Sequence, residues 1–137
     1  MTRSWTGGCA CGAVRYETSN EPLVELHCQC LDCQKRSGTG HGSYVTFASR
    51  SEIAMTGETK AWRMVGDSGA DKDHAFCPTC GTPVWLTFPG MPDIIAVHAA
   101  SLDDPDLFNP QMVTYGVRAR QWDTMDPALT TFERMPG

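Results

Sequence analysis

The sequence lacks any apolar segment long enough to span a membrane. A spanning helix needs about 18 or more consecutive apolar residues, and no such run occurs among the 137 residues. The first residues, MTRSWTGGCACG, also lack the apolar stretch of a secretory signal peptide. These absences predict a cytoplasmic protein that does not contact a membrane, and the length predicts a single domain over residues 1–137.

An excess of positive charge is also absent. The chain has 11 Lys and Arg residues against 16 Asp and Glu residues, so its formal net charge is −5. Because proteins bind nucleic-acid phosphates through clustered Lys and Arg side chains, nucleic acid is not an expected partner. The sequence leaves open whether the protein is a monomer or a homodimer.

Helical periodicity is scarce. Short β-like runs, separated by turns rich in the 13 glycines and nine prolines, make up most of the chain. Only two short helical turns are indicated, at Leu31–Arg36 and Pro105–Phe108. The expected strands are Ala13–Thr18, Val24–Cys28, Ser43–Ala48, Glu52–Thr56, Lys60–Val65, Asp73–Phe76, Val84–Phe88 and Ile94–Ala99. This pattern predicts an all-β domain.

Cysteine, by contrast, is abundant and clustered. An odd number of cysteines in CxC and CxxC spacings fits a disulfide framework poorly, and such clusters in a reducing compartment more often bind metal. The seven cysteines fall into three groups: Cys9 and Cys11; Cys28, Cys30 and Cys33; Cys77 and Cys80. The sequence therefore predicts metal binding.

Two of these groups have the composition of zinc knuckles. In FCPTCGTP, Pro78 stiffens the turn and Gly81 lets the backbone fold close to the sulfurs of Cys77 and Cys80. In GGCACG, glycines flank a second pair. Two ligands from each pair complete a closed tetrahedral zinc site on Cys9, Cys11, Cys77 and Cys80. A redox-active CxxC is the alternative for CPTC, but the helix that such a motif normally precedes is not indicated here.

The remaining group, in HCQCLDCQKRSG, has only three cysteines. A zinc ion with three protein ligands keeps one coordination position for water or substrate, as catalytic sites do. The alternative is a closed structural site in which a histidine is the fourth ligand. His27 is adjacent, although alternation along a strand points it away from Cys28, and His41 lies in the loop GTGHG. The sequence thus predicts a second zinc site on Cys28, Cys30 and Cys33.

Four segments together carry a family resemblance: GGCACGAVRY, HCQCLDCQKRSG, FCPTCGTPVW and AVHAASLDDP. In order and spacing they resemble the glutathione-dependent formaldehyde-activating enzyme family, which also includes centromere protein V, over about residues 7–122. The resemblance implies a β-tent fold of small antiparallel sheets around a structural zinc. It also implies a catalytic zinc on Cys28, Cys30 and Cys33, and a carbon–sulfur lyase activity that joins glutathione and formaldehyde into S-hydroxymethylglutathione.

The expected chemistry uses the open site. A thiolate of glutathione binds there and adds to the carbonyl carbon of formaldehyde or a related small electrophile. Lys35 and Arg36 are candidates for binding the carboxylates of glutathione, and the alternative is that both are ordinary solvated cations. His41 is the candidate proton carrier to the developing alkoxide.

Two other histidines have more modest expected roles. His98, within IIAVHAAS, is expected to be a hydrogen-bonded strand residue. His74 precedes the Cys77 pair and can hydrogen-bond a metal-bound sulfur there.

Two other classes of function remain open. In the first, both zinc ions are structural and an exposed sheet binds a partner. In the second, the three-cysteine cluster is a thiol redox sensor that loses zinc when two of its cysteines are oxidised to a disulfide.

Overall fold

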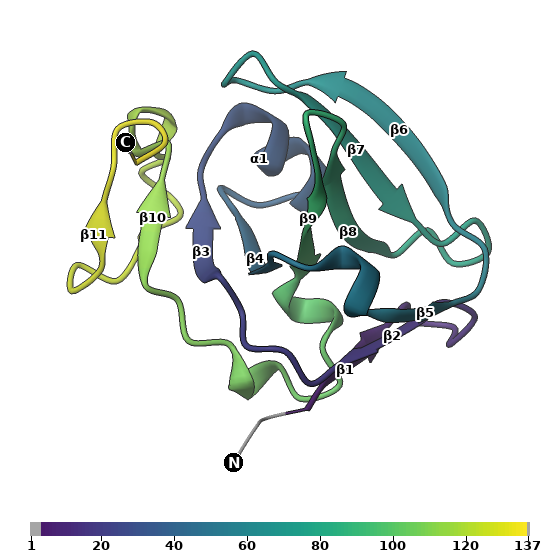
Figure 1. The fold of residues 1–137 in the computed structure, drawn as a ribbon. Coiled ribbons are helices and arrows are strands. Elements are labelled where there is room, and N and C mark those ends of the chain that lie inside the picture. Colours follow the sequence, from purple (N-terminus) through teal and green to yellow (C-terminus); the bar gives the residue numbers. More distant parts are fainter. Residues whose placement is uncertain (1–3, 137) are drawn as a thin grey trace.

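The computed structural model describes residues 4–136, which fold into two β-sheets, one α-helix and four short 3₁₀ segments (Figure 1). The smaller sheet is antiparallel, with strand order β1-β2-β5, and contains β1 (Trp5–Gly8), β2 (Arg15–Thr18) and β5 (Ala54–Thr56). The helix α1 covers Leu31–Ser37. The 3₁₀ segments are η1 (Arg50–Glu52), η2 (Ala99–Ser101), η3 (Pro105–Leu107) and η4 (Gly116–Arg118).

The larger sheet has eight strands in the order β11-β10-β3-β4-β9-β8-β7-β6. Its strands are β3 (Val24–Cys28), β4 (Gly42–Phe47), β6 (Lys60–Val65), β7 (Asp71–Phe76), β8 (Pro83–Phe88), β9 (Met91–His98), β10 (Met112–Thr114) and β11 (Thr130–Thr131). The expected all-β fold with one or two short helical turns is confirmed. The sheet is not wholly antiparallel, because β10 runs parallel to both β3 and β11.

Side chains alternate between the two faces of the large sheet, and each face has its own apolar cluster. Val45, Trp85 and Val97 belong to the cluster that also contains Trp5 of the small sheet. Their neighbours Tyr44, Leu86 and Ala96 belong to a second cluster. Because successive residues of a strand point to opposite faces, the second cluster lies on the face away from the small sheet.

The two cysteine groups follow this division. Cys9 and Cys77 belong to the first apolar cluster. Cys28, Cys30 and Cys33 belong to the second cluster, together with Tyr44. The large sheet therefore separates the two candidate metal sites.

Helix α1 carries one of the three clustered cysteines within its first turn. It begins after Cys30, whose Sγ accepts a hydrogen bond from the backbone N–H of Cys33 at 3.3 Å. It ends at Gly38, which has a φ of 73° and donates its N–H to the carbonyl of Gln34. A left-handed residue at this position favours glycine. Over residues 4–136, no helix has the length and apolar character needed to cross a membrane.

Candidate metal centres and the adjoining cavity

Four cysteine sulfurs converge where the segment between β1 and β2 meets the turn between β7 and β8. The Sγ atoms of Cys9, Cys11, Cys77 and Cys80 all lie within 4.8 Å of one another. Two of the distances are 3.6 Å, between Cys9 and Cys11, and 3.7 Å, between Cys11 and Cys77. A tetrahedral zinc ion with Zn–S bonds of about 2.3 Å places its sulfurs about 3.8 Å apart. The spacing of these thiols therefore fits one metal ion held by four cysteines.

The backbone around this cluster turns its N–H groups toward the sulfurs. Cys9 Sγ accepts from the N–H of Val14 at 3.2 Å, and Cys77 Sγ accepts from the N–H of Thr79 at 3.4 Å. Gly81 has a φ of 78°, which lets the chain reverse after Cys80 as the sequence predicted. Such bonds stabilise thiolates, which are the form that binds metal.

The second cluster brings three buried thiols together. Cys28 ends β3, Cys30 caps α1, and Cys33 lies in the helix. Their exposed fractions are 7%, 0% and 1%, and their Sγ atoms lie within 4.8 Å of one another. Among the described residues, no His, Asp or Glu joins this group. The donor set suits a soft metal such as zinc, with three protein ligands.

Mutual hydrogen bonding already favours a thiolate in this cluster. Hydrogen bonds from Cys30 and Cys33 lower the pKa of Cys28 to about 3, and hydrogen bonding with Cys28 raises the pKa of Cys33 well above its usual value. The Cys28 sulfur is therefore the first of the three to lose its proton. A bound cation would let all three lose their protons, as metal ligands must. Each of the seven cysteines is free of disulfide bonding.

Three groups that the sequence did not single out surround these thiols. The hydroxyl of Tyr44, on β4, donates to Cys33 Sγ at 3.1 Å. Lys72 Nζ, on β7, lies 3.8 Å from Cys30 Sγ. The same ammonium lies 3.2 Å from a carboxylate oxygen of Asp32, the residue before Cys33. Positive charge and hydrogen-bond donors therefore face the cluster from two strands of the large sheet.

Asp32 connects this lysine to a buried histidine. His74 Nε2 lies 3.1 Å from the carboxylate oxygen that also binds Lys72, and Lys72, Asp32 and His74 are 12%, 3% and 0% exposed. Burial alone would raise the pKa of Asp32, but the hydrogen bond from His74 and the charge of Lys72 lower it. Burial likewise opposes the charged form of Lys72, yet the charges of Cys33 and Cys30 raise its pKa above its usual value. His74 thus hydrogen-bonds the residue before Cys33, and the expected bond to a sulfur of the Cys77 pair is not observed.

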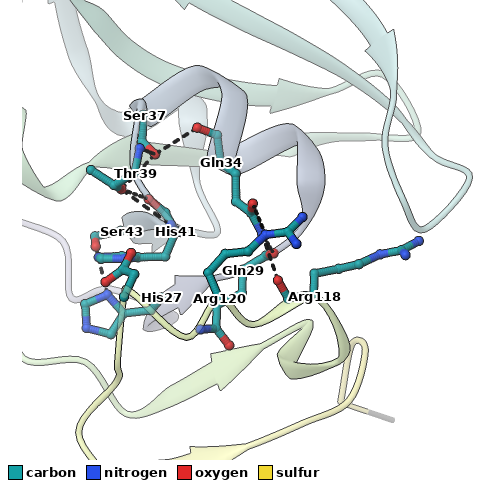
Figure 2. Close-up of polar contacts among 10 residues, drawn as sticks. His27, Gln29, Gln34, Ser37, Thr39, His41, Ser43, Arg118 and Arg120 are labelled. Carbon is teal, nitrogen blue, oxygen red and sulfur yellow. Dashed lines mark hydrogen bonds and ion pairs between the residues drawn. The ribbon is translucent and has the colours of Figure 1, made fainter.

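His27 and His41 lie on the other side of β3. His27 Nδ1 is 2.8 Å from the hydroxyl of Ser43, and its ring meets that of His41 edge to face at 5.0 Å (Figure 2). His41 Nδ1 lies 2.6 Å from a carboxylate oxygen of Asp123. Because Cys28 follows His27 in the strand, its side chain points to the opposite face. The structure therefore does not bring His41, the predicted proton carrier, to the three thiols.

A glutamine ties α1 to the C-terminal part of the chain. Gln34 Nε2 donates to the carbonyls of Gln29 and Arg118 at 2.8 and 2.9 Å, and Gln34 Oε1 accepts from Arg120 Nε at 2.9 Å (Figure 2). Leu31 N–H also donates to Asp67, in the turn between β6 and β7. The helix that carries Cys33 is thus held at its first turn and near its middle.

The two predicted cations of α1 have different surroundings. Lys35 is exposed. Arg36 lines a cavity of about 590 Å³ beside the four-cysteine cluster, and its guanidinium carbon lies 5.7 Å from the centre of the Phe76 ring. Of the two, only Arg36 lines this cavity, which is partly open to solvent and large enough for a small molecule.

Comparison with known proteins identifies the family of this chain. The family model of the glutathione-dependent formaldehyde-activating enzyme matches residues 4–118. A protein of Halomonas elongata named "Putative glutathione-dependent formaldehyde-activating enzyme" is 27% identical over 108 residues, which cover 76% of this chain and 68% of that protein. A crystal structure of a Rhodobacter sphaeroides protein superposes with a TM-score of 0.57 at 25% identity, over 77% of this chain and 96% of that one. The chain belongs to the glutathione-dependent formaldehyde-activating enzyme family.

Proposed function

We propose that this protein is a zinc-dependent carbon–sulfur lyase that adds the thiolate of glutathione to formaldehyde or a related small aldehyde. The observation that carries the proposal is the cluster of three buried thiols within 4.8 Å of one another, with no fourth ligand from the described residues. Membership of the family supplies the substrate class. We place the activity in the cytoplasm, where thiols remain reduced.

The three thiolates of Cys28, Cys30 and Cys33 would hold the ion of the reactive site, and the four-cysteine cluster would hold a structural one. When bound at the open site, zinc supplies a Lewis acid that keeps an incoming thiol deprotonated near neutral pH. The chain itself supplies compensating charge. Lys72 lies beside Cys30 and offsets part of the negative charge that gathers when a further thiolate approaches.

The reaction forms one bond and rearranges one proton. The sulfur lone pair attacks the aldehyde carbon, the C–S bond forms, and the carbonyl π electrons move to oxygen. The proton released from the thiol ends on that oxygen, so the thiol and aldehyde give a hydroxymethyl thioether with no other reactant. Tyr44 and Lys72 are the O–H and N–H donors in contact with the cluster, and His41 as proton carrier stays a prediction.

Cobalt substitution tests the proposal directly. Co²⁺ replaces zinc in thiolate sites and has a thiolate-to-metal absorption band that strengthens with each sulfur bound. We expect glutathione at millimolar concentration to strengthen this band, while S-methylglutathione, which has no free thiol, leaves it unchanged. Exchange between glutathione and ¹³C-formaldehyde, followed by NMR, should be faster with the protein than without it.

The Cys30→Ser variant is the control for the site. It should keep the metal of the four-cysteine cluster and lose the response to glutathione, because only the three-cysteine cluster is altered. An unchanged spectrum on adding glutathione to the unmodified protein, together with no faster exchange of formaldehyde, would contradict the proposed function.

A further inference from the structure

The cavity beside the four-cysteine cluster is much larger than formaldehyde requires. Its volume of about 590 Å³ falls within the range of small-molecule sites, roughly 300–1,000 Å³, whereas formaldehyde has two heavy atoms. The C-terminal end of α1, the Thr82–Pro83 turn and the η2 segment form its walls. A cavity of this size can hold a compound of several carbon atoms.

Arg36 presents an unpaired positive charge to this cavity. Its Nε and Nη2 atoms are buried without a hydrogen-bond acceptor, and among residues 4–136 it forms no ion pair. The other arginine of the cavity, Arg15, is already paired with Asp103 at 2.8 Å. A buried charged donor without an acceptor is more unfavourable than a neutral one. Arg36 is therefore the lining residue whose positive charge lacks a counter-ion among residues 4–136.

His98, at the end of β9, is a second donor without a partner. His98 lies in strand β9 as expected, but its buried Nε2 atom lacks the expected hydrogen bond. Burial, followed by the charge of Arg36, lowers the pKa of His98 to about 4, so its ring is neutral near pH 7. A neutral imidazole with its proton on Nε2 can donate to an anion without adding charge.

One helical spacing and one chain of contacts place this cavity near the three-cysteine cluster. Arg36 follows Cys33 by three residues, and such residues are neighbours on one face of a helix. The ring of His98 lies 5.0 Å from that of Tyr44, whose hydroxyl donates to Cys33 Sγ. A molecule in the cavity therefore lies close to the reactive site of the proposed function.

We propose that this cavity binds the carboxylate of a small-molecule substrate, with Arg36 as its charged anchor and His98 as a second donor. A singly charged carboxylate suits the cavity better than a doubly charged phosphate, because Arg36 is the one uncompensated cation among the described residues that line it and the thiols of the four-cysteine cluster are close. The inference rests on the proposed function and extends it. The carboxylate belongs either to the thiol cosubstrate or to the aldehyde, which would then be an oxo acid.

Calorimetric titration of the zinc-loaded protein with three compounds separates these sources. S-methylglutathione carries carboxylates without a thiol, glyoxylate carries a carboxylate on an aldehyde, and cysteamine carries a thiol without a carboxylate. We expect Arg36→Gln to weaken binding of one carboxylate compound by about tenfold to a hundredfold, the range for a charge-assisted hydrogen bond. Cysteamine should bind both proteins equally, and Arg36→Lys should retain part of the affinity.

Lys35→Gln is the matched control, because it removes the same charge from the neighbouring, exposed position of the same helix. It should weaken binding by less than about threefold. Loss of S-methylglutathione binding in Arg36→Gln assigns the carboxylate to the thiol cosubstrate, and loss of glyoxylate binding assigns it to the aldehyde. Zinc content and thermal unfolding of each variant confirm that the fold is retained.

Three results would overturn the inference: no binding of either carboxylate compound by the unmodified protein at millimolar concentration, equal binding by Arg36→Gln, or equal weakening by Lys35→Gln. The cobalt experiment is independent of these. Carboxylate binding that depends on Arg36, together with no cobalt–thiolate response to glutathione, would defeat the proposed function and leave an anion site. A cobalt–thiolate response to glutathione, with carboxylate binding unchanged in Arg36→Gln, would support the proposed function and overturn the inference about the cavity.

Discussion

At the scale of single residues, Lys72 contributes a positive charge beside the sulfurs of the three-cysteine cluster. Its ammonium lies between Cys30 Sγ and the carboxylate of Asp32, and it is 12% exposed. Three thiolates close together repel one another, and a nearby cation reduces that repulsion. Lys72 therefore contributes both to the stability of the fold and to the charge balance of the three-cysteine cluster.

We predict that Lys72→Gln lowers both zinc retention and stability. Removing one partner of a buried ion pair costs about 3–5 kcal/mol when the other charge is left uncompensated, although His74 still contacts Asp32 and should reduce that loss. Urea unfolding measures the stability, and competition with a coloured chelator measures the affinity for zinc.

The double variant Lys72→Gln with Asp32→Asn separates the two effects. It removes the unpaired carboxylate, so stability should recover, while zinc retention at the three-cysteine cluster should stay weak. A single variant as stable as the unmodified protein, or a double variant that retains zinc normally, would contradict this account of Lys72.

The residues of the site differ in how far the sequence could predict them. The grouping of the seven cysteines follows from spacing alone, since the residues of each knuckle are neighbours in the chain. Lys72 and His74 lie about forty residues from Asp32, and only the curvature and strand order of the large sheet bring them there. Their separation by two residues does place both on one face of β7, but nothing in the sequence indicates which element that face covers.

At the scale of elements, the two cysteine groups differ in how far apart in the sequence the segments that they join lie. The four-cysteine cluster joins segments before β2 and after β7, which lie far apart in the sequence. The three-cysteine cluster joins β3 to the helix that follows it directly. Because a crosslink that closes a long loop removes more conformational entropy from the unfolded chain, the first cluster should stabilise the fold more.

We therefore predict that Cys77→Ser lowers the melting temperature more than Cys30→Ser does. Cys30→Ser should keep about one zinc per chain and a cooperative unfolding transition, because serine can still cap α1. Cys77→Ser should lose its structural zinc and unfold at a lower temperature or fail to fold. Metal analysis and calorimetry check both variants, and equal destabilisation would indicate that both clusters are structural.

The elements that the sequence predicted well are those whose pattern is local. The bounds of β3 and β6 agree with the expectation, and α1 is one residue longer than expected. Three strands were missed: β1, β10 and β11. Strand β10 has three residues and is defined by its parallel pairing with β3, from which most of the chain separates it. Such a pairing depends on tertiary contacts and leaves no periodic signal.

At the scale of the whole molecule, the large sheet determines where the two cysteine clusters lie. It places the four-cysteine cluster and the three-cysteine cluster on opposite faces, and the cavity lies where the end of α1 approaches the four-cysteine cluster and η2. A ligand there would contact segments from both halves of the chain. Binding should therefore stabilise the entire domain. For the same reason, protonation of His98, which lines the cavity, should change the stability that global unfolding measures.

The last prediction concerns this global pH dependence. His98 has a pKa of about 4 in the folded protein because of burial and the charge of Arg36, against about 6.5 in an unfolded chain. Between these values the unfolded chain binds a proton that the folded one does not, so stability is fully present above about pH 6.5 and falls as the pH drops toward 4. The loss attributable to His98 should reach about 3 kcal/mol.

Acid also protonates the thiolates, which destabilises the metal sites in any variant, so the difference between the unmodified protein and His98→Gln isolates the histidine. Urea unfolding at several pH values from 7 to 4.5 should give a smaller slope for His98→Gln, and parallel curves for the two proteins would show that His98 is not buried in its neutral form.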